Sequence, residues 1–317
     1  ARVRSKIGKS AMRWTFCLLL LLSLIIPVYT FSGAVPLPAM AEESLVSIEL
    51  KLPLEEYSVK FAVIGDSGTG GSKQYQVGEQ MALYHKLFPF TFVLMLGDNL
   101  YGGEDPEDYE EKFELPYKEL LDSGVDFYAS LGNHDDPDQP YYQKFNMDGK
   151  RYYTFKTQNV GFFALDSTQM DKIQLDWLER ELDNSDADWK ICFFHHPIYS
   201  SGARHGSDED LREVLEPLFL THGVKAVFSG HDHFYERIKP QKGIYYFVSG
   251  AAGKVRSRNI RRSGLTARGF DKDQHFILIE IVGERLYFQA ISRSGETVDS
   301  GILYRQTTQH SLPSVNP

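Results

Sequence analysis

The chain has 317 residues, with 34 Lys and Arg against 43 Asp and Glu, and its formal net charge at pH 7 is −9. Residues 1–41 hold five of the basic residues and none of the acidic ones, so the rest of the chain carries a charge of −14. A body this acidic repels polyphosphate backbones, which argues against nucleic acid as a partner. A small anion could still bind where metal ions make a site positive.

The N-terminus has the pattern of a targeting segment. A basic stretch ends at Arg13, an apolar run covers residues 14–29, and Ala39-Met40-Ala41 fits a small-x-small cleavage site. We therefore expect a signal peptide over residues 1–41, a secreted or periplasmic protein, and no stable membrane association after cleavage. The alternative is an uncleaved membrane anchor, but Pro27 interrupts the apolar run and argues against it.

Residues 42–317 are expected to form a single domain, because they contain no repeat, no low-complexity tract and no linker. Cys192 is the one cysteine outside the targeting segment, so the mature chain has no partner for an intrachain disulfide. Its apolar neighbours favour a buried small hydrophobic side chain over a reactive thiol.

Short apolar runs alternate with helical patterns through the first part of this domain. A buried strand is predicted over residues 61–64. A helix follows, with one apolar face made by Val77, Met81, Tyr84 and Phe88. The next elements are a strand over residues 90–96, an amphipathic stretch over 109–121 and a strand over 127–131.

The second half continues this alternation and then becomes rich in strands. Two further helix faces are marked by Leu175, Leu178 and Leu182, and by Leu211, Val214, Leu215 and Leu218. Pro217 is expected to kink or end the second of these helices. Strands are predicted over Trp189–Phe194, 224–228, 276–281 and 286–291, and around Tyr245. Strands and helices that alternate before a strand-rich end predict a layered α/β sandwich with mixed sheets.

Five of the predicted strands end abruptly in clusters of Gly, Asp, Asn and His. The clusters are Gly65-Asp66-Ser67-Gly68, Gly97-Asp98-Asn99-Leu100-Tyr101, Gly132-Asn133-His134-Asp135, His195-His196-Pro197 and Gly230-His231-Asp232-His233. Any one of them could be an ordinary polar turn. Five in order indicate a shared site, because functional sites of open α/β sheets form at the carboxyl ends of strands. Carboxylate oxygens and imidazole nitrogens suit iron, zinc or manganese, and the lack of a thiolate cluster argues against a structural zinc site.

These blocks resemble the calcineurin-like metallophosphoesterase pattern, over most of the chain from Phe61 to about Tyr287. Most members begin with Asp-x-His, whereas here the first block is Asp66-Ser67-Gly68 and a histidine is missing. Tyr101, three residues after Asp98, is the replacement typical of the small, tartrate-resistant-like purple acid phosphatases. A phenolate is a hard anionic donor that favours a trivalent ion, although Tyr101 could also be a packed loop aromatic. The resemblance implies an α/β fold, a layered αββα sandwich with two mixed β-sheets.

The resemblance also implies two metal sites. Fe³⁺ would be held by Asp66, Tyr101 and His233, and a divalent ion (Fe²⁺, Zn²⁺ or Mn²⁺) by Asn133, His195 and His231. Asp98 would bridge the two ions. His195 is preferred over the alternative His196, because the ligand of the family lies two residues before the proline.

The activity implied is the hydrolysis of small phosphate monoesters, with a metal-bound hydroxide as the nucleophile. His134 and His205 would stabilise or protonate the leaving alkoxide. A histidine that caps a turn and an exposed loop histidine are the structural alternatives for them. Two competing functions are a phosphodiesterase or nucleotide pyrophosphatase on the same scaffold, and a binding protein that has kept the fold without catalysis.

The sequence also contains charged runs near the ligand blocks. A basic run could steer anionic substrates if it faces the site, but a solvated surface loop is the preferred interpretation; it comprises Lys254, Arg256, Arg258, Arg261, Arg262 and Arg268. Acidic runs over residues 104–111 and 135–138 are interpreted as solvated surface without a role.

Overall fold

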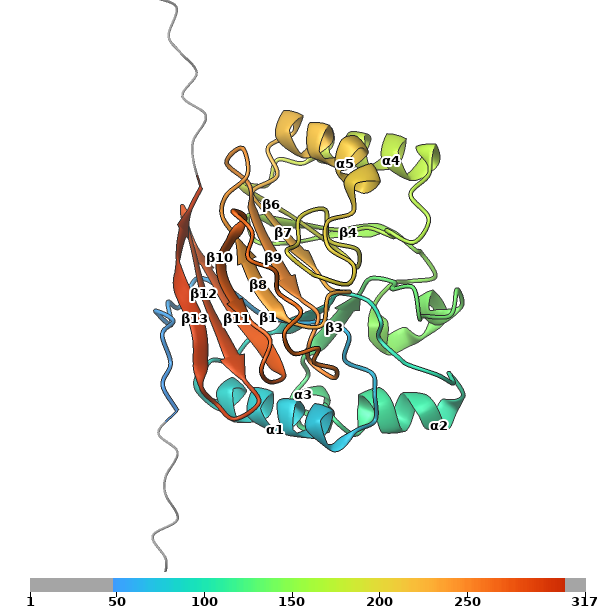
Figure 1. Cartoon of the computed structure of the whole chain (residues 1–317), viewed down its shortest axis with the longest axis vertical. Coiled ribbons are helices and arrows are strands. Elements are labelled where there is room, and N and C mark those ends of the chain that lie inside the picture. The colour runs from blue at the N-terminus through green and yellow to red at the C-terminus, as the bar shows by residue number, and fades with distance from the viewer. Residues whose placement is uncertain (1–47, 306–317) are drawn as a thin grey trace, which may run out of the picture. The chain divides into compact units, whose positions relative to one another are not determined.

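Two β-sheets stacked face to face organise the chain, with helices on the outer side of each (Figure 1). The computed structural model describes residues 48–305, so the predicted signal peptide and the possible anchor over residues 1–41 lie outside the described part. Among residues 48–305, no helix is both long and apolar enough to cross a membrane.

The first sheet has six strands in the order β13-β12-β11-β1-β2-β3. Its strands are β1 (Val59–Ile64), β2 (Phe92–Met95), β3 (Asp126–Ala129), β11 (His275–Val282), β12 (Arg285–Ser292) and β13 (Thr297–Tyr304). Strands β1, β2 and β3 run parallel, whereas β11, β12 and β13 pair antiparallel with their neighbours. The sheet is therefore mixed, as predicted.

The second sheet has seven strands in the order β10-β8-β9-β7-β6-β5-β4. Its strands are β4 (Tyr153–Thr157), β5 (Val160–Ala164), β6 (Trp189–Phe194), β7 (Ala226–Ser229), β8 (Tyr235–Ile238), β9 (Tyr245–Ser249) and β10 (Thr266–Phe270). Strands β5, β6, β7 and β9 are parallel, and the remaining pairings are antiparallel. This sheet is also mixed.

Helices cover the outer faces of both sheets, which completes the predicted αββα layering (Figure 1). On the first sheet lie α1 (Ser72–Leu87) and the short helices α2 (Pro106–Tyr109) and α3 (Lys118–Asp122). On the second sheet lie α4 (Lys172–Asn184) and α5 (Glu209–Thr221). In Figure 1 the two groups stand on opposite sides of the stacked sheets.

Aromatic side chains from both sheets interlock in the space between them. Phe61 of β1 stacks on Phe92 of β2 at 5.2 Å, and the edge of Phe162 from β5 meets each of these rings at 5.3 Å. All three side chains are buried. Close aromatic packing of this kind fixes the separation of the sheets, and with it the positions of the loops at their ends.

Two of the predicted helical segments differ in detail from the structure, and of the two outcomes expected at Pro217, a kink or an end, the end is wrong. The stretch over 109–121 is not one helix, because α2 leads into a π-helical turn at Glu110–Glu114 and the chain restarts as α3 after Pro116, which cannot donate a backbone hydrogen bond. Pro217 does not end α5, which continues to Thr221 because Leu215 and Phe219 are held in the core. Val214 is 40% exposed and lies off the buried face of that helix.

Candidate metal centre

The five polar clusters lie on loops that follow neighbouring parallel strands. Strands β1, β2 and β3 are adjacent in the first sheet, and β6 and β7 are adjacent in the second. Their carboxyl ends meet at one end of the stack, where the backbone N–H of Asp66 donates to Gly97 O at 3.0 Å and that of Gly230 donates to His195 O at 2.9 Å. The site therefore lies between the sheets, and each sheet contributes part of it.

One group of side chains gathers around Asp66. The Tyr101 hydroxyl donates to Asp66 Oδ1 at 3.2 Å and lies 3.3 Å from His233 Nε2. His233 Nε2 is itself 3.3 Å from the same carboxylate oxygen. Two oxygens and a nitrogen thus face one small volume. Asp98 borders this volume, because its carboxylate lies within 4.8 Å of the Asp66 and His233 ligand atoms.

A second group gathers around His195. His195 Nε2 lies 3.1 Å from Asn133 Oδ1, 3.1 Å from His231 Nδ1 and 3.4 Å from Asp98 Oδ1. Leu96 O contacts the other ring nitrogen of His195 at 2.9 Å, which fixes the orientation of the ring. Asp98 therefore borders both groups, at the position expected for a bridging carboxylate.

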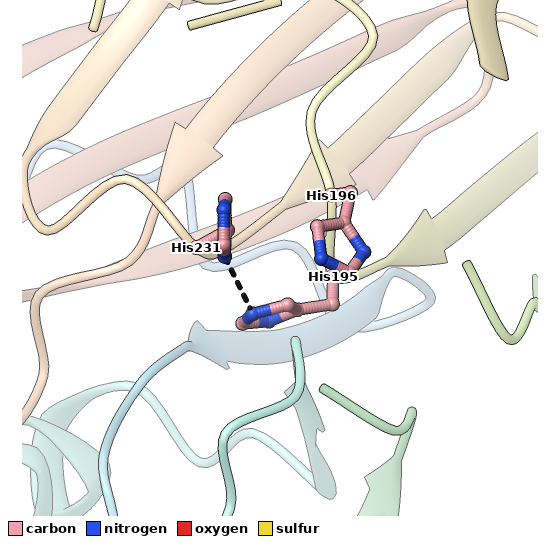
Figure 2. A group of neighbouring side chains, drawn as sticks. All are labelled: His195, His196 and His231. Carbon is pink, nitrogen blue, oxygen red and sulfur yellow. Dashed lines mark hydrogen bonds between the residues drawn. The ribbon is translucent and has the colours of Figure 1, made fainter. Parts of the chain in front are cut away.

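His196 lies beside this second group but makes different contacts. Its Nδ1 is 2.9 Å from Ser167 Oγ, whereas the dashed line in Figure 2 joins His231 to His195. The ring of His196 is 4.5 Å from that of His231, and the three histidines could together hold an ion. His195 alone of the two contacts Asn133 and Asp98, so the geometry favours it as the ligand in the second group.

Burial controls the protonation of both groups. It raises the pKa of Asp66 well above its usual value, with a further contribution from Asp98, and it raises the pKa of Tyr101. Burial also lowers the pKa of His195 and His233 to about 4 and that of His231 to about 2. The imidazoles therefore stay neutral with a lone pair free for a metal, and a bound cation would offset the unfavourable negative charge of the buried Asp66 carboxylate, so these residues fit a pair of metal ions.

The pKa of Asp98 is lowered, whereas that of Asp66 is raised. Burial alone would raise its pKa, but His195 and the backbone N–H of His134, which donates to Asp98 Oδ1 at 3.0 Å, lower it overall. An ionised carboxylate between two groups of ligands is suited to bridge two cations.

Gly68 explains why the first block lacks a histidine. A side chain at this position would collide with the backbone of Asn99 and Leu100. The loop after β2 passes over Gly68 and is tied to it, because the backbone N–H of Tyr101 donates to Gly68 O at 2.8 Å. The missing histidine and the added tyrosine are therefore two aspects of one packing arrangement.

Asp135 is an organising residue that the sequence interpretation missed. Its carboxylate accepts hydrogen bonds from the backbone N–H groups of Asn99 at 2.7 Å, Leu100 at 3.1 Å and Gly132 at 2.8 Å. It thereby joins the loop after β2 to the loop after β3. The prediction that the whole acidic run 135–138 is solvated without a role is wrong at this position, because position in a charged run does not reveal the direction of a side chain.

His134 and His205 lie on the exposed side of the two groups. The ring of His134 is 5.1 Å from that of Tyr101, and the ring of His205 is 4.2 Å from that of His231. A cavity of about 490 Å³ opens next to His205, with His196, Arg204, Asp208 and His231 among its walls. Burial lowers the pKa of His205.

The basic run divides in two. Lys254 Nζ lies 3.1 Å from the centroid of the Tyr101 ring, and the Arg256 backbone N–H donates to His233 O at 2.9 Å, so both residues are at the site. Arg258, Arg261, Arg262 and Arg268 are exposed. The preferred interpretation of a solvated loop is thus wrong for the first two residues and confirmed for Arg258, Arg261 and Arg262, whereas Arg268 is exposed but lies in β10.

Two stacked mixed sheets whose loops bring together two groups of oxygen and nitrogen ligands define the class of metallophosphoesterases. The family model of the calcineurin-like phosphoesterases matches residues 59–235, and the chain belongs to this family. It is therefore a hydrolase of phosphoesters, and the two groups of residues described above could hold the metal ions through which it works.

Individual relatives are purple acid phosphatases or share their fold. Tartrate-resistant acid phosphatase type 5 of Rattus norvegicus is 24% identical over 76% of this chain and 89% of its own length. The structure of a purple acid phosphatase from yellow lupin seeds aligns with a TM-score of 0.67 and 17% identity, over 80% of this chain and 55% of that one. GAP50 of Plasmodium, described as the anchor in the inner membrane complex, aligns with a TM-score of 0.69 and 20% identity over 80% of this chain and 90% of that one. At these identities the two structures show the fold alone.

Proposed function

We propose that the chain hydrolyses small phosphate monoesters with an Fe³⁺ ion paired with Fe²⁺, Zn²⁺ or Mn²⁺, in the manner of purple acid phosphatases. The observation that supports this most strongly is the Tyr101 hydroxyl beside Asp66 and His233. A phenolate in a set with a carboxylate and an imidazole favours a trivalent ion by its charge and hardness.

In this proposal each of the two groups holds one ion. Asp66, Tyr101 and His233 would hold Fe³⁺, Asn133, His195 and His231 would hold the divalent ion, and Asp98 would bridge them. When bound, the metal pair supplies the positive charge that attracts a phosphate and the activated water that attacks phosphorus. A compact cationic centre within an acidic chain selects small phosphorylated substrates rather than nucleic acid.

His134 and His205 would act on the leaving alcohol. Both are exposed, from loops on opposite sheets, and both rings adjoin a side chain assigned to a metal. A histidine in that position can donate a proton to the developing alkoxide or stabilise its charge. We further propose that residues 1–41 are a signal peptide, that residues 42–317 form a single domain, and that the enzyme is secreted or periplasmic.

The proposal is tested by the metal content and colour of the purified protein. About two ions per chain, one of them iron, and a visible tyrosinate-to-iron absorption band are expected. Tyr101→Phe should lose the band. The matched control is Tyr75→Phe, because Tyr75 is bonded to Glu111 O away from the site, and it should keep the band. A colourless, iron-free and fully active wild-type protein would refute the ferric assignment.

Substrate class is tested separately. An aryl phosphate should be turned over much faster than the corresponding bis-aryl diester. A dominant diesterase rate would replace the monoesterase proposal by a phosphodiesterase or nucleotide pyrophosphatase on the same centre. No turnover of either ester by protein with its full metal content would favour a non-catalytic role.

A further inference from the structure

Two cationic side chains on the loop after β9 lie at the candidate metal centre, and neither makes an ion pair with a residue in the described part of the chain. Lys254 Nζ stands over the face of the Tyr101 ring, 3.1 Å from its centroid, and makes no ion pair or hydrogen bond with any residue between 48 and 305. Arg256 likewise has no ion pair within the described part of the chain, and its Nη1 is buried without a hydrogen-bond acceptor. Both side chains are half-buried.

Unpaired cations of this kind are unexpected in so acidic a chain. Other partly buried arginines have found carboxylates: Arg237 pairs with Asp299 at 2.8 Å and Arg293 with Asp273 at 2.9 Å. A buried guanidinium donor without an acceptor costs free energy, so its persistence calls for a physical explanation. An acceptor supplied by a bound molecule would satisfy it.

The metals themselves cannot be that partner. An ammonium and a guanidinium have no lone pair to offer a metal, and their charge repels one. Burial lowers the pKa of Lys254, Asp98 and Asp66 raise it, and Arg256 lowers it further, so these three residues are the charged groups that act on it.

The loop that carries the two cations is fixed at both ends. The backbone N–H of Gly253 donates to Asp66 O at 3.1 Å, immediately before Lys254. Further along, Ala203 N donates to Asn259 O at 2.7 Å and Arg261 N to Ser201 O at 2.8 Å, which joins this loop to the one that carries His205. A binding group held in place in this way loses little conformational freedom when a ligand arrives.

We propose that Lys254 and Arg256 form a subsite for a second anionic group of the substrate, a carboxylate or another phosphate a few bonds from the phosphate that is hydrolysed. The inference rests on the proposed phosphatase function and narrows its substrate class. The Tyr101 hydroxyl faces the ligands while Lys254 lies over the ring, so the subsite is adjacent to the metal centre and offset from it. Arg256 adds a planar donor suited to carboxylate or phosphate.

Catalytic selectivity is measured with glycerol phosphate and phosphoglycerate, which differ mainly in the added carboxylate. The wild-type kcat/KM should favour phosphoglycerate, and Lys254→Met and Arg256→Gln should each lower that preference by roughly tenfold, the effect of losing one hydrogen bond to a charged group. Arg258→Gln is the matched control, since it removes the same charge from an exposed position on the same loop, and it should keep the preference.

Binding gives a readout that does not depend on turnover. Calorimetry on metal-loaded protein would compare methylphosphonate, phosphonoacetate and methylenediphosphonate. The two ligands with a second anionic group should bind more tightly than methylphosphonate, and the margin should shrink roughly tenfold in Lys254→Met and Arg256→Gln at unchanged metal content. The tighter of the two identifies the preferred second group.

Three results would overturn the subsite. The first is equal wild-type affinity for all three phosphonates, and the second is an equal loss of kcat/KM on both substrates in Lys254→Met and Arg256→Gln. The third is a loss of preference in Arg258→Gln as large as in Arg256→Gln, which would indicate general attraction by the loop. Failure of the proposed function looks different, because the wild-type protein would then lack two metal ions or fail to hydrolyse glycerol phosphate, whatever the binding comparison gives.

Discussion

Asp135→Asn should destabilise the protein and weaken its hold on metal, because Asp135 joins two of the ligand loops. Its Oδ1 accepts from Asn99 N, Leu100 N and Gln139 Nε2 at 2.7, 3.1 and 2.9 Å. Its Oδ2 accepts from Gly132 N at 2.8 Å and from Asn99 Nδ2 at 3.2 Å. An amide can accept at only one of these two atoms, so the variant loses the two bonds to Oδ2 and sets its own NH₂ group against two donors.

The size of the effect follows from those two bonds. Each hydrogen bond to a charged group contributes about 1.5–3 kcal/mol. Part of this loss is offset, because burial and the neighbouring Asp98 raise the pKa of Asp135, and the neutral amide removes that unfavourable charge. We expect the free energy of unfolding of the metal-free protein to fall by about 3 kcal/mol.

Urea unfolding of metal-free protein measures this change, with Asp138→Asn as the control. Asp138 is exposed on the same loop, and its side chain makes no hydrogen bond within residues 48–305, so its loss should change stability by less than about 0.5 kcal/mol. Metal affinity should fall roughly 10- to 100-fold in Asp135→Asn, the usual effect of removing a group that orients ligands. Equal unfolding midpoints for the two variants would refute the assigned role of Asp135.

Three further outcomes are expected. Burial lowers the pKa of His275 to about 3 from 6.5. As the pH falls below about 6.5, the unfolded chain therefore binds a proton that the folded chain does not. The free energy of unfolding should then drop by up to about 1.4 kcal/mol per pH unit. In urea titrations the variant His275→Gln, which can still form a hydrogen bond with Ser249, should lack this part of the pH dependence of stability. An unchanged pH dependence in the variant would contradict the assignment to His275. Cys192 is buried with a raised pKa, so in protein that lacks residues 1–41 a thiol reagent should label one thiol after denaturation and none before; labelling of native protein would show the thiol to be accessible. His134→Gln should lower kcat roughly 100-fold for an alkyl phosphate and much less for a nitrophenyl phosphate, whose leaving group needs no proton; equal losses would reject a role as proton donor.

The layered fold could be predicted because its parallel strands are buried on both faces and read as apolar runs. The predicted strand over Trp189–Phe194 matches β6 to the residue, and the predicted strands near β1, β2, β3 and β7 differ from them by a few residues at their ends. The same runs end in polar clusters, so the convergence of their side chains followed from where parallel strands end.

Elements that depend on tertiary contacts could not be predicted in this way. Strand β13 contains Gly301 and polar residues, and it exists because it pairs along β12. Helix α5 passes through Pro217 because the core holds the turns on either side. Local propensity is weaker than either of these interactions.

The sequence could not predict that Asp135 and Lys254 point inward, because this direction also depends on tertiary contacts. Both residues stand in charged runs of the kind that normally face solvent, next to others that do. Which member of such a run turns inward depends on the loop conformation, and that conformation is determined by loops of distant sequence. Asp135 points inward because its carboxylate accepts hydrogen bonds from the backbone of the loop after β2, and Lys254 because its ammonium lies over the Tyr101 ring.

The backbone of three candidate ligands is itself in an unfavourable conformation. Asp66, Asp98 and His231 have φ of 54°, 50° and 67°, a left-handed conformation that costs a side-chain-bearing residue about 1 kcal/mol or more and that local sequence would assign to glycine. The neighbouring glycine at Gly230 can take no side chain either, since a Cβ there would come within 2.6 Å of Asp66 Oδ2. Hydrogen bonds between loops of the two sheets hold these strained residues in place, as when His231 N donates to Asp66 Oδ2 at 2.8 Å. The geometry of the centre is therefore a property of the stacked sheets, and no single loop sequence encodes it.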